Sequence, residues 1–301
     1  MKDLIIIGGG PAGLTAGIYG IRAGLDLVII EKISPGGQVV NSYEIENYPG
    51  FANPISGWDL MSGMEEQVRR LGAEIISGDV VAVKKDNSFF TVTLTDGEMQ
   101  AKSVIIAGGT ANRKLNVPGE KEYTGRGVSY CATCDGAFFK DKVTVVVGGG
   151  DAALEEADFL TRFASKVYLI HRREQFRGAD ILQKKVLKNE KIIPILNTAV
   201  ESINGDEKVG SVSLKNNNGE TQILNTDGVF IFVGFDPNSS LVDSKLLNEN
   251  REIIVDMNMR TALPGLFAAG DIRSNSKRQI VTAAADGATA ALNAYEYLNI
   301  N

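Results

Sequence analysis

The two cysteines of this chain are the residues whose type and spacing most directly suggest chemistry. Cys131 and Cys134 are the only cysteines among 301 residues, and two residues separate them. This CxxC spacing is typical of dithiol/disulfide redox pairs, and it could also supply two ligands to a zinc ion. A structural zinc site needs four ligands, and the pair together with the single histidine, His171, supplies three at most. The spacing therefore predicts a redox pair and no metal site.

An aspartate beside the pair is the candidate proton donor. Asp135 follows Cys134 directly and is the only carboxylate expected near the cysteines. A disulfide that opens releases a thiolate, so we predict that Asp135 relays a proton to it. A role as the residue that begins a helix is compatible with this one. His171 falls in a nucleotide-binding position, so the chain has no other histidine to act as a base.

A glycine-rich turn near the amino terminus is the first element that could hold a nucleotide. The apolar run 4–7 leads into GGGPAG, a helix is predicted over 14–23, and the next strand, 27–30, ends at Glu31. The glycines allow a tight turn and close approach of a pyrophosphate to a helix N-terminus. Glu31 suits a free ribose diol and repels a 2′-phosphate. The predicted contacts are Gly8, Gly10, Pro11, Gly13, Glu31 and Lys32.

A second turn of the same kind follows the β-branched run 143–147. It reads GGGDAA, with alanine in the place of the third glycine, and the strand 166–170 comes after its helix. The position that Glu31 holds in the first copy is here taken by a basic cluster. Arginines in this place suit the 2′-phosphate of NADPH through bidentate hydrogen bonds. The predicted contacts are Gly148, Gly149, Gly150, Asp151, Ala152, His171, Arg172, Arg173 and Arg177.

Two segments near the carboxyl terminus favour a flavin in the first site. The run 261–271 reads as a short buried strand that ends in Gly270 and Asp271, and an aspartate there can bind the hydroxyls of a ribityl chain. A long alanine-rich helix is predicted over 279–298, and its N-terminus could face a flavin carbonyl or phosphate. Taken alone, this helix is better interpreted as a packing helix. Strands are predicted over 74–82, 89–95, 98–106 and most of 194–233.

Composition limits the classes of partner. Hydrophobic residues make up 44%, charged residues 23%, and the net charge is −6, as expected for a soluble chain of two domains. No stripe of Lys and Arg is present, which argues against nucleic acid as a partner. No apolar run reaches the roughly 18 residues of a membrane helix. The absence of a signal-peptide pattern and the pairing of the only cysteines as CxxC predict a cytoplasmic protein.

Taken together, these motifs closely resemble the low-molecular-weight thioredoxin reductases, and the resemblance runs nearly end to end. Where many relatives have Ala-Thr-Gly, this chain has Gly108-Gly109-Thr110, which keeps the residues small. The motifs that carry the resemblance are GGGPAG at 8–13, GGQ at 36–38, ENYPG at 46–50, CATCDG at 131–136, GGGDAALEEA at 148–157, HRREQFR at 171–177, GLFAAGD at 265–271 and RQIVTAAADG at 278–287.

The resemblance implies an α/β fold of two Rossmann-like nucleotide-binding domains of the three-layer ββα type, the second inserted in the first. Residues 1–112 and 241–301 would form the FAD domain, and 113–240 the NADPH domain that carries the cysteines. The resemblance also implies a homodimer. The residues implied to contact FAD, besides those of the first glycine turn, are Gly37, Gln38, Asn47, Gly270, Asp271, Arg278, Gln279 and Ile280.

The resemblance further implies a path for electrons. They would pass from NADPH to FAD, then to the Cys131–Cys134 disulfide, and then to thioredoxin or a thioredoxin- or glutaredoxin-like protein. By resemblance, Cys134 faces the flavin and Cys131 attacks the partner. Because the cysteines and the NADPH site share one domain and must both reach one flavin, we expect that domain to rotate at crossings near 112–116 and 238–243.

Three other functions use parts of the same pattern. A ferredoxin-type NADP reductase has both nucleotide sites but no need of CATC, so the cysteines argue against it. A ferredoxin-driven thioredoxin reductase keeps the cysteines but lacks the second glycine turn and the arginines, which are present here. A nucleotide-sensing scaffold with a redox-switch cysteine pair predicts binding without sustained turnover.

Overall fold

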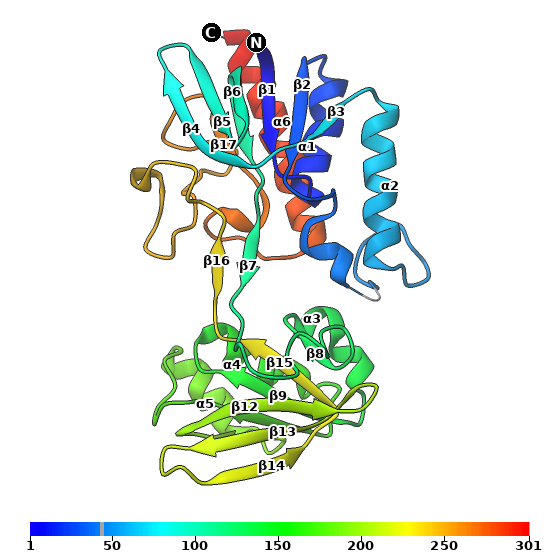
Figure 1. Ribbon diagram of the computed structural model, residues 1–301, viewed down its shortest axis with the longest axis vertical. Helices are drawn as coiled ribbons and strands as arrows, with labels where there is room; N and C mark the ends of the chain where they lie inside the picture. The colour runs from blue at the N-terminus through cyan, green and yellow to red at the C-terminus, as the bar shows by residue number, and fades with distance from the viewer. Residues whose placement is uncertain (43–44, 301) are drawn as a thin grey trace. The chain divides into compact units, whose positions relative to one another are not determined.

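The structure is a computed structural model that describes residues 1–42 and 45–300. The chain divides into two compact units, which are drawn in Figure 1. One, the discontinuous unit, comprises Met1–Ala111 and Asp236–Asn301, and the other, the inserted unit, is Asn112–Phe235. The chain passes between them at two short strands that pair with each other, β7 (Thr110–Asn112) and β16 (Phe235–Pro237).

The second crossing lies nearer the amino terminus than the predicted boundary at 240. Asn238 bonds to the loop between β6 and β7: its N–H donates to the Gly109 carbonyl at 3.1 Å and its side-chain amide to the Gly108 carbonyl at 2.7 Å. The Ser239 hydroxyl donates to the Arg251 carbonyl at 2.6 Å. These hydrogen bonds come from residues with no apolar pattern, which is why the sequence did not locate the crossing.

The discontinuous unit is built on one sheet whose strand order is β3-β2-β1-β6-β5-β4, with β17 also paired to β6. Strands β3, β2, β1, β6 and β17 run parallel, and β4 and β5 extend the sheet in antiparallel pairs. The strands are β1 (Lys2–Ile7), β2 (Leu27–Glu31), β3 (Glu74–Ser77), β4 (Val80–Asp86), β5 (Phe89–Leu94), β6 (Gly97–Ile106) and β17 (Leu266–Ala268).

Side chains of β1 alternate between two buried layers, as a strand covered on both faces requires. Leu4 and Ile6 pack in one core with the helices, whereas Ile5 and Ile7 pack in a second core with the antiparallel strands and the segment 241–255. The helices of this unit are α1 (Pro11–Arg22), α2 (Gly57–Arg70) and α6 (Ile280–Ile300), with the short 3₁₀ turns η1 (Gly37–Asn41), η3 (Ser244–Leu246) and η4 (Gly270–Ile272).

One predicted strand in this unit is wrong. The run 74–82 forms two strands, β3 and β4, because the chain turns at Gly78, whose N–H donates to the Glu31 carbonyl at 3.0 Å. A side chain at Gly78 would overlap Leu94. In the sequence Ser77-Gly78-Asp79 interrupts two short apolar stretches, and this turn signal marks the break.

The inserted unit repeats the plan. Its parallel sheet has the order β11-β10-β9-β15-β8, with helices on one face and the antiparallel sheet β12-β13-β14 on the other (Figure 1). The predicted fold class, two Rossmann-like domains with the second inserted in the first, is confirmed. The elements are β8 (Val128–Ser129), α3 (Ala132–Asp135), η2 (Gly136–Phe139), β9 (Val143–Gly148), α4 (Asp151–Leu160), β10 (Lys166–Ile170), α5 (Asp180–Lys188), β11 (Ile192–Ile195), β12 (Thr198–Gly205), β13 (Val209–Asn216), β14 (Thr221–Asn225) and β15 (Gly228–Phe232).

Candidate redox and nucleotide sites

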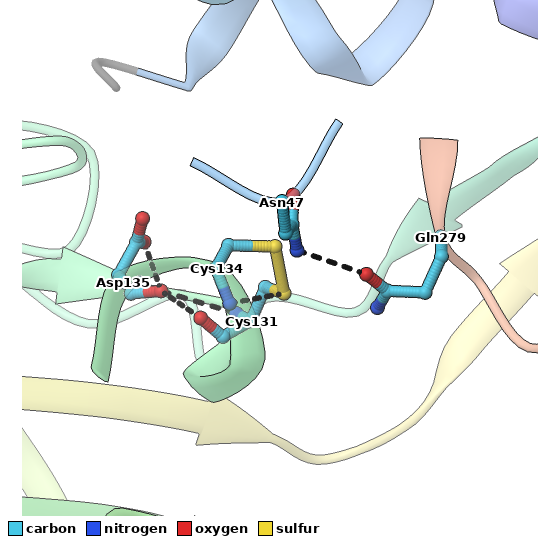
Figure 2. Close-up of a disulfide and its surroundings, with 6 residues drawn as sticks. Asn47, Cys131, Cys134, Asp135 and Gln279 are labelled. Carbon is cyan, nitrogen blue, oxygen red and sulfur yellow. Dashed lines mark hydrogen bonds between the residues drawn. A yellow bond between two sulfur atoms is a disulfide. The ribbon is translucent and has the colours of Figure 1, made fainter. Parts of the chain in front are cut away.

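The cysteine pair lies at the start of the short helix α3 and forms a disulfide (Figure 2). The two Cα atoms are 5.3 Å apart, an ordinary distance for a disulfide. Cys131 is the N-cap residue in an extended conformation, and its sulfur accepts the N–H of Cys134 at 3.2 Å. When the disulfide opens, this donor favours a thiolate at Cys131 over one at Cys134.

Asp135 is the last residue of α3 and is half-buried. Its carboxylate accepts a hydrogen bond from the Ser129 hydroxyl at 2.5 Å. Burial raises the pKa of the Asp135 carboxyl above its usual range, and the Ser129 bond opposes that rise. The oxygen of Ser129 also accepts the Cys131 N–H at 3.0 Å, so one serine connects the acid to the redox turn. The sequence offered no signal for Ser129 beyond its place two residues before the pair.

The expectation that Asp135 is the only carboxylate near the cysteines is wrong. Glu156, on α4, lies against the turn between them, and the backbone N–H groups of Ala132 and Thr133 and the Thr133 hydroxyl act to lower the pKa of its carboxyl. Burial is the main cause that raises the pKa of Glu156. The two helices pack together across a stretch of chain that includes a whole strand, and sequence proximity could not reveal that contact.

A third carboxylate fastens the residue that precedes the pair. The Tyr130 hydroxyl donates to Glu120 at 2.8 Å, and burial together with this partner raises the pKa of Tyr130. Glu120 is 4% exposed and also accepts the N–H groups of Leu115 and Asn116. The ammonium of Lys114 lies 3.8 Å from the centre of the Tyr130 ring. The segment that follows β7 is therefore held to the redox turn inside the inserted unit.

The first glycine turn has the shape of a pyrophosphate site. Gly8 has φ of +107°, and a side chain at Gly13 would overlap the Gly8 carbonyl oxygen. Helix α1 begins with no side-chain cap at Gly10, and nothing lies within 4 Å of where a Gly10 side chain would start. Its first N–H groups are thus available to an anion. The Glu31 carboxylate accepts the Gly9 N–H at 2.6 Å, which brings it to the turn.

Some of the other residues predicted for this site lie near the first glycine turn, and one does not. Gly36 donates its N–H to the Gly9 carbonyl at 2.8 Å, which places Gly37 and Gln38 beside the turn. Gly270 packs against Ala12 of α1, so Asp271 follows at the same end of the helix. By contrast, Lys32 is exposed and pairs with Asp79 at 2.8 Å.

The segments around Asn47 and Gln279 meet within the discontinuous unit. The Asn47 amide donates to the Gln279 carbonyl oxygen at 3.2 Å, and Figure 2 shows this bond. Gln279 and Ile280 lie at the start of α6, and Arg278 has φ of +53° and pairs with Glu252 at 3.5 Å. Burial raises the pKa of Asp271, whose carboxylate accepts the Ser276 hydroxyl at 3.1 Å.

Two residues that the sequence did not single out hold this end of the sheet. Asp286 of α6 is 6% exposed, accepts the Gly270 N–H at 3.1 Å and pairs with Arg273 at 2.7 Å. This buried pair fixes the Gly270 turn against α6. A salt bridge between positions in an irregular turn and a helix leaves no pattern in a single sequence.

The second glycine turn combines an open helix end with a buried histidine. Helix α4 begins at Asp151 with no side-chain cap at Gly150. His171 is 5% exposed and lies against Gly149, where any side chain would overlap its ring. Burial first, and then Arg177 and Arg173, lower the pKa of His171. The neutral imidazole of His171 therefore packs against Gly149 and leaves no room for a side chain there.

The three arginines predicted to bind a phosphate have exposed side chains. Arg172 and Arg173 follow β10 directly, and the Arg177 N–H donates to the Gly149 carbonyl at 2.6 Å, so the cluster borders the turn. Over residues 1–42 and 45–300, no acidic side chain forms a salt bridge with any of the three. Asp151 is engaged elsewhere, since its carboxylate accepts the Ala179 N–H at 2.7 Å.

No group of three or more His, Cys, Asp or Glu side chains among the described residues could hold a metal ion. No helix in the same residues is long and apolar enough to cross a membrane.

The paired glycine turns and the CxxC disulfide define a class of protein. The family model of the pyridine nucleotide-disulphide oxidoreductases matches residues 2–287, and the chain belongs to that family of flavin- and NADPH-dependent oxidoreductases. Within it, the chain is a member of the thioredoxin reductases. It is 50% identical over 299 residues to the thioredoxin reductase of Listeria innocua, covering 98% of this chain and 93% of that protein.

Solved structures of two further thioredoxin reductases are also similar. The crystal structure of the Streptococcus pyogenes enzyme has 45% sequence identity and a TM-score of 0.95, and covers 100% of this chain and 99% of that one. The Lactococcus lactis enzyme in its FR conformation has 44% identity and covers 100% of both chains, but its TM-score is 0.69.

Proposed function

We propose that this protein uses NADPH to reduce the disulfide of a thioredoxin, or of a thioredoxin- or glutaredoxin-like protein, through FAD and the Cys131–Cys134 pair. One observation carries the proposal: the only two cysteines of the chain form a disulfide at a helix start, beside the half-buried acid Asp135. The named relatives support the choice of thioredoxin as the acceptor.

The discontinuous unit is proposed to hold FAD. The uncapped start of α1 would receive the pyrophosphate, Glu31 the ribose diol, and Asp271 the ribityl hydroxyls. Asn47, Gln279 and the start of α6 would border the ring. When bound, FAD supplies the exchange between a hydride and a pair of electrons that a disulfide can accept. Lys32 is the least supported contact, because its ammonium pairs with Asp79.

The inserted unit is proposed to hold NADPH at the start of α4. The Gly148–Gly150 turn would face the pyrophosphate, and Arg172, Arg173 and Arg177 the 2′-phosphate. His171 would act as a wall of this site, because its ring is buried beneath Gly149.

The cysteines and Asp135 are proposed to carry out the exchange with the partner protein. The Cys131 thiolate attacks a sulfur of the partner disulfide, and Cys134 then attacks the mixed disulfide and releases the partner as a dithiol. The pair loses two electrons and closes to a disulfide, and the partner gains both. Asp135 holds and returns the proton that the sulfurs exchange. The N–H of Cys134 at the Cys131 sulfur supports Cys131 as the attacking thiol.

Turnover is proposed to require rotation of the inserted unit about β7 and β16. The pair and the NADPH site lie in that one unit, and both must reach a flavin held by the other. Two relatives nearly equal in identity to this chain, 45% and 44%, have TM-scores of 0.95 and 0.69, a spread that is expected where rigid units change arrangement.

We also propose a cytoplasmic homodimer, for which the half-exposed Tyr19 of α1 and Tyr295 of α6 offer apolar contact surface.

Anaerobic titration tests the whole proposal. NADPH should bleach the flavin absorbance, and oxidised thioredoxin should restore it, with one dithiol formed in thioredoxin per NADPH. Cys134→Ser should still be bleached but should transfer nothing to thioredoxin. A Cys134→Ser protein that reduced its acceptor at the full rate would instead indicate a ferredoxin-type NADP reductase, and a flavin that only ferredoxin bleached would indicate the ferredoxin-driven class.

A further inference from the structure

A buried carboxyl that the proposed reaction does not use lies against the redox turn. Glu156 is in the middle of α4, and its Oε2 is buried without a hydrogen-bond partner among the described residues. The helix α4 packs against α3, and the backbone N–H groups of Ala132 and Thr133 and the Thr133 hydroxyl favour the charged form of this carboxyl. These are the two residues between the cysteines, so the carboxyl lies against the turn that changes when the disulfide opens.

We propose that Glu156 is a positioning residue whose charge sets the equilibrium between disulfide and dithiol at Cys131 and Cys134. The proposal rests on the proposed function only in requiring that the pair cycles between these two states. The Cys134 N–H, which bonds to the Cys131 sulfur at 3.2 Å, is a donor that would stabilise a Cys131 thiolate. A carboxylate at Glu156 lies on the helix that packs against the same turn and adds a like charge, so it opposes the thiolate.

The charged groups around Glu156 do not cancel this effect. On its own helix, Glu155 adds repulsion. From α3 the titratable groups are Asp135 and the two cysteines. The helix α5 faces α4 with Lys185, but that ammonium pairs with Asp158 at 2.6 Å. The core that α4 shares with β9, β10 and β15 is apolar. Within the part of the chain that the structure describes, no cation forms a salt bridge with Glu156.

The charge of Glu156 and the opening of the disulfide are therefore linked. Two electrons, from NADPH or from an added dithiol, break the S–S bond, and protons then distribute over the two sulfurs and the nearby carboxyls. A thiolate at Cys131 makes ionisation of Glu156 less favourable, so reduction draws a proton to Glu156. Conversely, an ionised Glu156 favours the disulfide, and a neutral one favours the dithiol.

Glu156→Gln separates charge from shape, because it keeps the size and one acceptor oxygen. Holoenzyme is equilibrated anaerobically with mixtures of reduced and oxidised dithiothreitol, quenched with a maleimide, and read by mass; every label reports this pair, since the chain has no other cysteine. At about pH 8 the variant should favour the dithiol about tenfold more than the wild type, or ~30 mV for two electrons. The difference should close towards pH values at which Glu156 is protonated.

Two further variants make the result decisive. Glu190→Gln removes an exposed glutamate of the same unit and should match the wild type at every pH. Glu156→Asp keeps the charge and should keep a pH-dependent difference from Glu156→Gln. Equal equilibria for wild type and Glu156→Gln, or an offset that does not change with pH, would overturn the proposal and leave only a structural role. If dithiothreitol reduces the pair but NADPH does not, the proposed function fails and this measurement still stands.

Discussion

At the scale of single residues, the structure surrounds the cysteine pair with acids rather than with a histidine. All three acids lie in the inserted unit: Asp135 belongs to the stretch 130–135, and Glu120 and Glu156 lie against it. Burial raises the pKa of Asp135 and Glu156, so each can hold a proton under conditions in which an exposed carboxyl is ionised.

Removing the proton donor should slow transfer to the partner more than reduction of the flavin. In Asp135→Asn we expect the rate of thioredoxin reduction to fall by at least about 10²-fold, the usual contribution of a positioned acid. Bleaching of the flavin by NADPH in single turnover should change little. Asp141→Asn, an exposed neighbour, is the control. If Asp135→Asn slowed thioredoxin reduction and flavin bleaching equally, the proposed role of Asp135 as proton donor would be wrong.

The raised pKa of Asp135 also predicts a change in stability with pH. The folded protein binds this proton more tightly than the unfolded chain, so the stabilisation is complete below the unfolded pKa of about 4 and is lost as pH rises through the folded pKa. The free energy of unfolding of Asp135→Asn should therefore exceed that of the wild type near neutral pH, and the difference should shrink on acidification. Urea titrations at several pH values measure this, and a constant difference would contradict it.

These residues show what a sequence can and cannot predict about a site. The pair and Asp135 are adjacent in the chain, and the chemistry of CxxC needs them there. Ser129 and Glu156 act through a hydrogen bond and a helix contact that depend on the fold, and neither type of residue is unusual where it stands. His171 lies beside the second turn with its ring buried against Gly149, and its contact with NADPH stays a prediction.

At the scale of elements, each nucleotide site depends on one turn between a strand and an uncapped helix. Gly13→Ala should break the first, because the new methyl group would overlap the Gly8 carbonyl oxygen. We expect purified protein to lose most of its FAD, measured as the ratio of flavin to protein absorbance. Gly63→Ala, in an exposed position of α2 with open space around it, should keep the flavin and gain stability, by up to about 1 kcal/mol. Full flavin content in Gly13→Ala would count against this site.

The exposed arginines after β10 should determine the choice of pyridine nucleotide. Replacing Arg172 and Arg173 with Ala should raise the KM for NADPH by 10-fold or more, roughly the effect of losing charge-assisted hydrogen bonds to a phosphate. The KM for NADH should change far less, because NADH has no 2′-phosphate. Arg162→Ala, on the turn after α4, is the matched control. Equal effects on both nucleotides would argue against a phosphate role.

The boundaries of an element could be predicted from the sequence where a local motif determines them. The glycine turns and the strands that enter them are predicted because their pattern and their chemistry coincide. The break between β3 and β4, by contrast, depends on a backbone hydrogen bond to a distant residue, from Gly78 to Glu31. The same is true of the crossing at β16, which is fixed by Asn238 and Ser239.

At the scale of the whole molecule, the proposed rotation makes the two crossings part of the mechanism. A bifunctional reagent that joins the discontinuous unit to the inserted unit should abolish multiple turnover while FAD stays bound. Protein treated with the monofunctional form of the same reagent should remain active, which controls for modification alone. Full steady-state activity in the joined protein would exclude rotation as a required step.

The insertion of one unit within the other also sets the order in which the polypeptide can fold as it is synthesised. The ribosome completes all of Asn112–Phe235 before it makes β17 and α6, which belong to the first sheet and to the core around α1. The inserted unit has every strand it needs at that moment, whereas the unit that began earlier still lacks its last strand and its longest helix. The half that starts first is thus finished last, and the nascent chain can acquire its redox turn before it can retain its flavin.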